Sequence, residues 1–256
     1  MVSFILYVMR LVSIITPIYN AEKWFKETFE SVLNQSFKDF EWIIVDDCST
    51  DNSLKLISEL IKDYPNLKLI KAEKNGGTAR ARNIGLRNAT GRYITFLDAD
   101  DILDPTYLEE QVKFIKDNGP IVSAGYIRLT PNSKSEFMVP KDVTYKSVLK
   151  TCPLSCLTTM YDKDVVGERY FPEDLKKCED HTFWLDILKD GHVAHGNPKV
   201  LATYRILENS KSRNKFKLIK YEFRVYHKTQ KINWFKSWYY VFCWAINGKK
   251  KYKNVK

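Results

Sequence analysis

The sequence predicts an α/β protein built on a mostly parallel central sheet flanked by helices. Short apolar runs rich in β-branched residues alternate with amphipathic segments over the first hundred residues. The connections are short, and polar or glycine-containing turns follow the strand-like runs. This alternation is typical of parallel strands covered by helices. Ligands of such open sheets bind beyond the carboxyl ends of the strands, where we expect the functional site.

Apolar periodicity assigns the individual elements in order. Strands are expected at residues 11–16, 41–45, 67–71, 93–97, 121–129 and within 193–205. Helices are expected at about 24–33, before residue 60, and at 78–89, 105–117 and 179–191, the last one stopped by Gly191. The polar stretch 130–141 is expected to be a loop. The sequence contains neither an internal repeat nor a Gly/Ser linker.

Three carboxylates, Asp98, Asp100 and Asp101, follow the strand at 93–97. Repulsion and desolvation make such a cluster costly unless a cation neutralises it. Mg²⁺ and Mn²⁺ prefer oxygen ligands of this kind. Capping of a helix that begins near Pro105 explains one of the three carboxylates, and we assign that role to Asp101. The other two predict a site for a metal or a metal-bound diphosphate.

Composition favours a globular protein of a reducing compartment. The chain has 256 residues, of which 44% are hydrophobic, enough for a substantial core. Its five cysteines are scattered without paired spacing, which disfavours both a disulfide framework and a zinc site. The apolar residues 2–8 are too short to span a bilayer and lack the features of a secretory signal. We expect Met9 to be the native start and residues 1–8 to contribute little.

The positive charge is concentrated at the C-terminus. Residues 205–256 contain fifteen Lys and Arg against two acidic residues, interleaved with aromatic side chains. We therefore divide the chain into a domain at 1–204 and a basic, aromatic, helical extension at 205–256. Such a composition suits the headgroup layer of an anionic membrane, while a solvated basic face is the alternative. No nucleic-acid motif accompanies it, so we expect no nucleic-acid partner.

Several short motifs, taken together, resemble the family 2 glycosyltransferases, whose fold is the Rossmann-like GT-A fold. The resemblance covers about residues 12–212. The matching motifs are Thr16-Pro17-Ile18-Tyr19-Asn20, Gln35-Ser36-Phe37, Val45-Asp46-Asp47-Cys48-Ser49-Thr50-Asp51, Asn75-Gly76-Gly77, Ala81-Arg82-Asn83-Ile84-Gly85, Phe96-Leu97-Asp98-Ala99-Asp100-Asp101 and Glu179-Asp180. It implies transfer of a sugar from a UDP-sugar with Mn²⁺ or Mg²⁺ as cofactor.

The resemblance also assigns roles to individual residues. It implies a nucleotide-sugar site made of Pro17, Tyr19, Asp47, Gly77, Arg82, Asp98 and Asp100, with Pro17, Tyr19 and Asp47 around the uridine. Asp98 and Asp100 form the D-x-D motif, with Asp100 as the metal ligand and Asp98 nearer the ribose or a metal-bound water. Asp180 is implied to be the catalytic base of an inverting displacement. An acidic pair in the first turn of a helix is also favoured by the helix dipole alone.

Within the family, the segment after Tyr204 looks most like bacterial transferases of the teichuronic acid and surface-polysaccharide type. This likeness implies a saccharide acceptor carried on a polyprenyl lipid, and a cytoplasmic enzyme held peripherally on the inner face of the cell membrane. A polyprenyl-phosphate sugar synthase and a catalytically silent membrane adaptor are the alternatives. His195 is a further candidate metal ligand, although a surface or core histidine is the simpler interpretation. Trp184 is assigned to the core rather than to an acceptor site.

Overall fold

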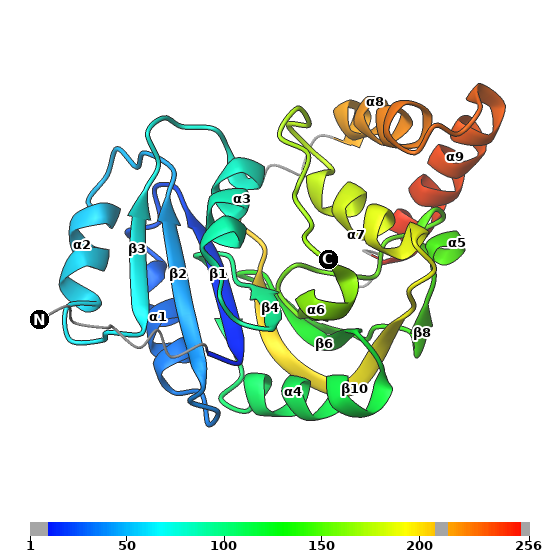
Figure 1. The fold of residues 1–256 in the computed structure, drawn as a ribbon. Coiled ribbons are helices and arrows are strands. Elements are labelled where there is room, and N and C mark those ends of the chain that lie inside the picture. Colours follow the sequence, from blue (N-terminus) through cyan, green and yellow to red (C-terminus); the bar gives the residue numbers. More distant parts are fainter. Residues whose placement is uncertain (1–9, 208–214, 252–256) are drawn as a thin grey trace, which may run out of the picture.

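The computed structural model describes residues 10–207 and 215–251, and the expectation about residues 1–8 lies outside them. Ten strands form one sheet with the order β3-β2-β1-β4-β9-β6-β10-β5, while β7 pairs with β6 and β8 with β10 (Figure 1). The strands are β1 (Val12–Ile18), β2 (Phe40–Asp46), β3 (Leu67–Lys71), β4 (Tyr93–Phe96), β5 (Ile102–Leu103), β6 (Ile121–Leu129), β7 (Lys134–Phe137), β8 (Asp142–Val143), β9 (Thr159–Asp162) and β10 (Ala194–Arg205).

Helices cover this sheet (Figure 1). They are α1 (Phe25–Leu33), α2 (Ser53–Leu60), α3 (Thr78–Asn88), α4 (Tyr107–Asn118), α5 (Tyr145–Val148), α6 (Lys163–Val166), α7 (Glu179–Lys189), α8 (Lys215–Arg224), the π-helical turn η1 (Val225–Thr229) and α9 (Trp234–Lys251). The α/β class and all six expected strands are confirmed.

The first four long strands are parallel, as the alternation of elements predicts. β1 pairs with β2 on one side and β4 on the other, and β2 pairs with β3. β1 is buried almost throughout because both of its faces are covered. The carboxyl ends of β1, β2, β3 and β4 therefore meet along one edge.

Four of the strands, β5, β7, β8 and β9, were not expected from the sequence. β9 inserts antiparallel between β4 and β6. Its four residues are all buried, so it carries no alternation of polar and apolar side chains that would identify it. β7 lies within the stretch expected to be a loop, and that expectation is wrong. It is a partly exposed edge strand whose polar side chains resemble those of a loop.

A separate hydrophobic cluster covers each face of the sheet. One contains Trp42 with Phe25 and Phe29 of α1, and it continues under α4. The other contains Phe183 and the rest of the buried face of α7, together with residues of η1 and α9. The C-terminal helices thus share a core with α7.

The C-terminal helices lie beside α5 and α7, at the upper right of Figure 1. Val225 and Tyr226 of η1 and Val241 of α9 are buried in the cluster that includes α7. No helix in the described part of the chain is long and apolar enough to cross a membrane.

Candidate active site

The loops after β1 and β2 are fastened to each other at the carboxyl edge of the sheet. Asn20, which has a positive φ of 53°, accepts a hydrogen bond from the Thr50 N–H at 2.8 Å through its side-chain oxygen. The Asn20 N–H donates to the Ser49 hydroxyl at 3.0 Å. Pro17 lies within β1, opposite Val45 of β2, and Tyr19 follows with 53% of its surface exposed. An exposed aromatic ring at a strand end is free to stack on a planar ligand.

Asp47 connects the end of β2 to the glycine loop before α3. Its Oδ1 accepts the Gly76 N–H at 2.8 Å and its Oδ2 accepts the Gly77 N–H at 2.7 Å. Its backbone carbonyl accepts the Asn75 side-chain amide at 2.9 Å. Each carboxylate oxygen retains a second lone pair, so this bracing leaves capacity to accept a hydrogen bond from a ligand.

Glycine is required at position 77 because the backbone there has φ 82° and ψ 173°. This region is essentially restricted to glycine. Gly76 has a different role, since a Cβ atom there would lie 2.2 Å from Cδ of Arg80. The Arg80 stem therefore lies against Gly76, whereas Arg82, two residues later in α3, is buried.

Arg82 and Asp98 form an ion pair across the site. Nη2 of Arg82 lies 2.6 Å from Oδ1 of Asp98. The arginine is 4% exposed and its guanidinium carbon lies 5.2 Å from the ring centroid of Phe171. Burial alone would lower its pKa, yet the negative charge of Asp98 raises the pKa overall and keeps Arg82 charged. A fixed positive charge is thereby held beside the first carboxylate of the D-x-D motif.

The second carboxylate of the motif, Asp100, is in an unfavourable environment for an anion. Burial, followed by the negative charge of Asp98, raises the pKa of Asp100 to about 6. The same two causes, with Asp100 added, raise the pKa of Asp101 well above its usual value. Ionisation of Asp100 and Asp101 is therefore disfavoured at this turn, first by burial and then by the neighbouring carboxylates.

Asp101 does not cap a helix, and the capping role expected for it is wrong. Its Oδ1 accepts the Arg205 N–H at 2.9 Å, which fixes the last residue of β10 to the acidic turn. Oδ2 has no hydrogen-bond partner among the described residues. The turn after β4 is also held by the Thr28 hydroxyl, which donates to the carbonyls of Ala99 and Asp101.

Asp180 lies in the first turn of α7 and is exposed. Cys178, two residues before Asp180, is the N-cap of the helix and has a left-handed backbone with φ 61°. The chain therefore turns sharply where α7 begins. The loop before α7 is fixed to α3, because the Asn83 side chain exchanges two hydrogen bonds with the backbone of Phe171. Asp180 is thus exposed at the start of α7, and the loop that leads into α7 is hydrogen-bonded to α3, the helix that contains Arg82.

The charge of Asp180 acts on buried groups that the acidic turn also influences. Burial raises the pKa of the Cys156 thiol, Arg82 opposes this rise, and Asp180 and Asp98 both add to it. Burial likewise raises the pKa of Tyr126, and the charges of Asp101 and Asp180 add to it. Asp180 and the carboxylates that follow β4 therefore influence the same buried groups.

His195 is not part of this site. Its Nδ1 lies 2.9 Å from Oδ1 of Asp142 near the beginning of β10, whereas Arg205 at the other end of β10 contacts Asp101. Ten residues of strand separate the two ends, roughly 30 Å at about 3.3 Å per residue. The simpler interpretation of His195 holds, and Trp184 is a core residue with no exposed surface.

The residues present fit a divalent cation shared with a phosphate ligand. Among the described residues, no group of three His, Cys, Asp or Glu side chains forms a cage for a metal. Mg²⁺ and related ions are commonly held by one or two carboxylates together with substrate phosphates. Asp98 and Asp100 offer these two carboxylates, and the raised pKa of Asp100 indicates that a nearby cation would relieve repulsion.

Two features of the site were missed from the sequence. Arg205 forms an ion pair with Glu27 and lies over the Trp24 ring at 5.1 Å, besides its contact with Asp101. His181, next to Asp180, forms a buried pair with Glu222 of α8 at 2.8 Å. Neither contact has a local signal, since each joins residues far apart in the sequence.

The sheet order, the helices and the acidic turn define a GT-A fold. A sequence profile described as glycosyl transferase family 2 matches residues 13–160, more than half of the chain. The chain therefore belongs to glycosyltransferase family 2, which confirms the resemblance seen in its motifs.

Two curated bacterial proteins match over most of their length. The putative teichuronic acid biosynthesis glycosyltransferase TuaG of Bacillus subtilis is 37% identical, over 94% of this chain and 97% of that protein. WfgD of Escherichia coli is described as a UDP-Glc:alpha-D-GlcNAc-diphosphoundecaprenol beta-1,3-glucosyltransferase. It is 37% identical over 84% of this chain and 85% of that protein.

Among solved structures, TarS of S. aureus, residues 1–349, in complex with UDP-GlcNAc is similar with a TM-score of 0.70 and 25% identity. The match covers 84% of this chain and 65% of that TarS chain. The fold of this chain is therefore similar to that of a GT-A protein whose structure was solved with a nucleotide sugar bound.

Proposed function

We propose that the protein is a metal-dependent, inverting transferase of hexosyl or N-acetylhexosaminyl groups from a UDP-sugar. The proposal is supported by the braced Asp47 loop, by the Arg82–Asp98 pair, and by an exposed Asp180 whose charge acts on the same buried thiol, Cys156, as that pair. UDP-glucose in the description of WfgD and UDP-GlcNAc in the TarS complex support this donor class.

In this proposal the uridine lies against Pro17 and Tyr19, and Asp47 accepts the uracil N–H. Gly77 permits close approach of the backbone to the nucleotide, while Arg82, held charged by Asp98, contributes positive potential near the diphosphate. Asp100 and Asp98 would hold Mn²⁺ or Mg²⁺. Such an ion supplies neutralisation of the charge that the departing diphosphate gains.

Asp180 is proposed as the general base. The acceptor hydroxyl oxygen forms a bond to the anomeric carbon as the bond from that carbon to the UDP oxygen breaks. The bonding electron pair leaves with UDP, and the hydroxyl proton passes to the Asp180 carboxylate. An exposed carboxylate at the helix start is accessible to an incoming hydroxyl, and attack opposite the leaving group inverts the anomeric centre.

The acceptor is proposed to be a saccharide carried on a polyprenyl diphosphate, in the synthesis of a bacterial cell-surface polysaccharide. The descriptions of TuaG and WfgD support this class of acceptor. An acceptor confined to a membrane suits a protein whose residues 205–256 form a basic extension to the GT-A domain at 1–204. We accordingly propose a cytoplasmic enzyme peripheral to the inner face of the cell membrane.

The test is Asp180→Asn, assayed as UDP release with a lipid-linked saccharide acceptor and a panel of UDP-sugars. We expect kcat to fall about 10²- to 10⁴-fold, as for loss of a general base. UDP affinity measured by calorimetry with Mn²⁺ should stay within about threefold. The matched control is Asp190→Asn at the other end of α7.

Other outcomes of the same assays identify the alternatives. Retained activity in Asp180→Asn with a polyprenyl phosphate acceptor would identify the polyprenyl-phosphate sugar synthase, whose phosphate acceptor needs little base catalysis. Wild-type protein that binds no UDP, or binds it equally with and without Mn²⁺, would identify the silent membrane adaptor.

A further inference from the structure

The helix α9 turns its aromatic side chains outward. Twelve large hydrophobic side chains of the described residues are exposed, and six of them lie in this one helix. Phe235 is 80% exposed and Phe242 is 65% exposed, whereas Ser237 is fully buried. This is the reverse of an ordinary surface helix, whose apolar stripe faces the core. The other exposed members of the set are Trp234, Trp238, Tyr239 and Ile246.

These side chains form a continuous stripe. Phe235, Tyr239, Phe242 and Ile246 follow one another at steps of four, three and four residues, which places them on one face of the helix. We call this set, with Trp234 and Trp238, the outer stripe of α9. Contiguous apolar surface of this kind marks an interaction site, unlike single exposed hydrophobic residues.

The outward orientation is fixed by contacts on the opposite side of the helix. Ser237 is fully buried, and Val241 is buried in the cluster that contains α7. At the far end, the Asn247 side chain donates to the Lys150 carbonyl at 3.1 Å. Rotating α9 to hide its outer stripe would expose Val241 and break the Asn247 contact, so the stripe stays on the outer surface.

The C-terminal segment that contains α9 carries charge of one sign. No acidic residue follows Glu222 in the sequence, whereas Lys228, Lys231 and Lys236 precede or enter the helix. A second copy of the chain packed through the same stripe would bring these like charges together. An anionic surface would instead be attracted to them. Tryptophan and tyrosine beside lysine are characteristic of side chains at the membrane–water interface.

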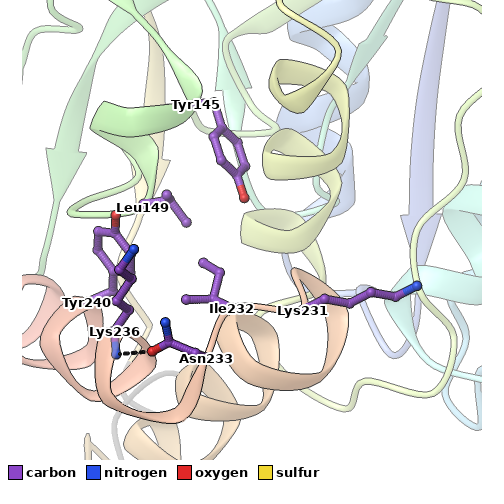
Figure 2. A pocket seen from close by; sticks show the side chains of 7 residues that line it. All are labelled: Tyr145, Leu149, Lys231, Ile232, Asn233, Lys236 and Tyr240. Carbon is purple, nitrogen blue, oxygen red and sulfur yellow. Dashed lines mark hydrogen bonds between the residues drawn. The ribbon is translucent and has the colours of Figure 1, made fainter.

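Lys236 lies where the outer stripe meets a pocket between α5 and α9 (Figure 2). The pocket has a volume of about 350 Å³ and is lined by Tyr145, Leu149, Lys231, Ile232, Asn233, Lys236 and Tyr240. In Figure 2 the Lys231 side chain extends away from the others. Lys236 is therefore the lysine of this pocket that lies within α9 itself.

From these observations we infer that α9 lies flat in the headgroup layer of an anionic bilayer, with its outer stripe inserted between the lipids and its opposite face kept on the protein. This inference deepens the proposed function and rests on its membrane-bound acceptor. Gln230 connects the surface to the transferase domain, because it donates to Asp186 of α7 at 2.6 Å and accepts from Tyr145 at 3.1 Å. Docking through α9 would hold α7, and Asp180 with it, at a fixed height above the lipid.

The test compares the wild-type chain with Phe235→Ser/Phe242→Ser in sedimentation with phosphatidylcholine vesicles that contain or lack about one-third phosphatidylglycerol. We expect the double variant to bind the anionic vesicles at least tenfold more weakly, since it removes two large apolar side chains whose transfer from water into lipid favours insertion. The matched control, Val165→Ser, removes a 54% exposed apolar side chain from α6 and should bind like wild type.

Lys236→Gln adds the electrostatic part of the test. It should weaken binding to anionic vesicles about two- to fivefold and leave binding to neutral vesicles unchanged. Equal binding of the double variant and wild type to the anionic vesicles would overturn the inference. The inference would also be overturned if the wild-type protein bound no vesicles but formed a dimer that the double variant does not form. The stripe would then be a contact between copies of the chain.

Calorimetry with UDP and Mn²⁺ separates this inference from the proposed transferase. Retained UDP binding by the double variant, with vesicle binding lost, supports both. Vesicle binding through the stripe by a wild-type protein that binds no UDP would overturn the transferase proposal only. If the double variant is unfolded by circular dichroism, quenching of wild-type tryptophan fluorescence by brominated lipids decides, and absence of quenching would overturn the inference.

Discussion

His181 and Glu222 form a buried pair that joins the helix of Asp180 to the C-terminal helices. Nδ1 of His181 lies 2.8 Å from Oε2 of Glu222, and Nε2 lies 3.1 Å from the Val148 carbonyl. Both side chains are almost inaccessible to solvent. The residue next to the proposed base is thereby held by the extension, so the stability of the α7–α8 contact bears on the geometry of the active site.

The pair predicts a specific dependence of stability on pH. Burial lowers the pKa of His181, but Glu222, the Val148 carbonyl and Asp180 together raise it by more, so the pKa lies above its usual value. A raised histidine pKa contributes stability that is fully present below about pH 6.5, the unfolded value, and is lost as pH rises through the folded value. Glu222→Gln should therefore lower the free energy of unfolding by about 2 kcal/mol at pH 6 and by less at pH 9.

Urea unfolding at the two pH values measures this difference. The control is Glu59→Gln, an exposed glutamate on α2, which should change stability by less than about 0.5 kcal/mol at both. A Glu222→Gln effect that is equal at pH 6 and pH 9 would contradict a charged pair.

Asp100 predicts a trade between stability and metal binding. Its pKa is about 6, mainly because of burial and then because of the charge of Asp98. At pH 7 the carboxylate is therefore ionised in the folded protein, and its ionisation lowers the free energy of unfolding. Because the folded pKa exceeds the unfolded value, ionisation costs stability as pH rises from about 4 through 6. Asp100→Asn should therefore raise the stability of the metal-free protein at pH 7 by roughly 1–2 kcal/mol and abolish stabilisation by Mn²⁺ with UDP.

Thermal unfolding with and without Mn²⁺ and UDP measures both effects. In the wild type, apparent Mn²⁺ affinity should fall up to about tenfold per pH unit below 6, since the proton competes with the ion. The control Asp117→Asn, on the exposed end of α4, should retain the Mn²⁺ response. A stabilised Asp100→Asn protein that still responds fully to Mn²⁺ would contradict the assignment.

Arg82 is expected to be irreplaceable by lysine. Its guanidinium is buried between Asp98 and the Phe96 and Phe171 rings, at 5.9 and 5.2 Å from their centroids. Lysine preserves the charge but not the planar group that stacks on rings. Arg82→Lys should weaken UDP binding at least tenfold in calorimetry, whereas Arg87→Lys, an exposed change on the same helix, should leave it unchanged. Equal UDP affinities of the Arg82→Lys and Arg87→Lys variants would show that Arg82 does not contribute to nucleotide binding.

Two glycine variants should change stability in opposite directions. Gly77→Ala forces a side chain into a backbone with φ 82° and should cost about 1–3 kcal/mol. It should also weaken UDP binding because the N–H that Asp47 accepts would move. Gly248→Ala, within α9 and with no atom within 4 Å of the added Cβ, should stabilise by about 0.5–1 kcal/mol. Chemical denaturation of both proteins distinguishes this backbone effect from a general intolerance of substitution.

The sequence predicted what local patterns can encode. Strand-end residues such as Asp47 and Asp98 were placed at one edge because each directly follows an apolar strand, and parallel strands align those ends. β9 was missed because it is short and wholly buried. The role of Asp101 was missed because its partner, Arg205, comes more than a hundred residues later. The outward orientation of α9 depends on which face α7 and η1 occupy, and helical periodicity alone cannot reveal this.

The bond between Asp101 and the Arg205 N–H has a practical consequence for anyone who dissects the protein. Arg205 is the first residue of the basic segment, and its N–H is also the hydrogen-bond donor that holds Asp101 in the acidic turn. A truncation placed immediately before Arg205 would remove this hydrogen bond together with the extension. A loss of UDP-sugar binding would then be wrongly attributed to the missing helices. A cut after Ile206, whose N–H donates to the Leu129 carbonyl at 2.8 Å, keeps the end of β10 intact.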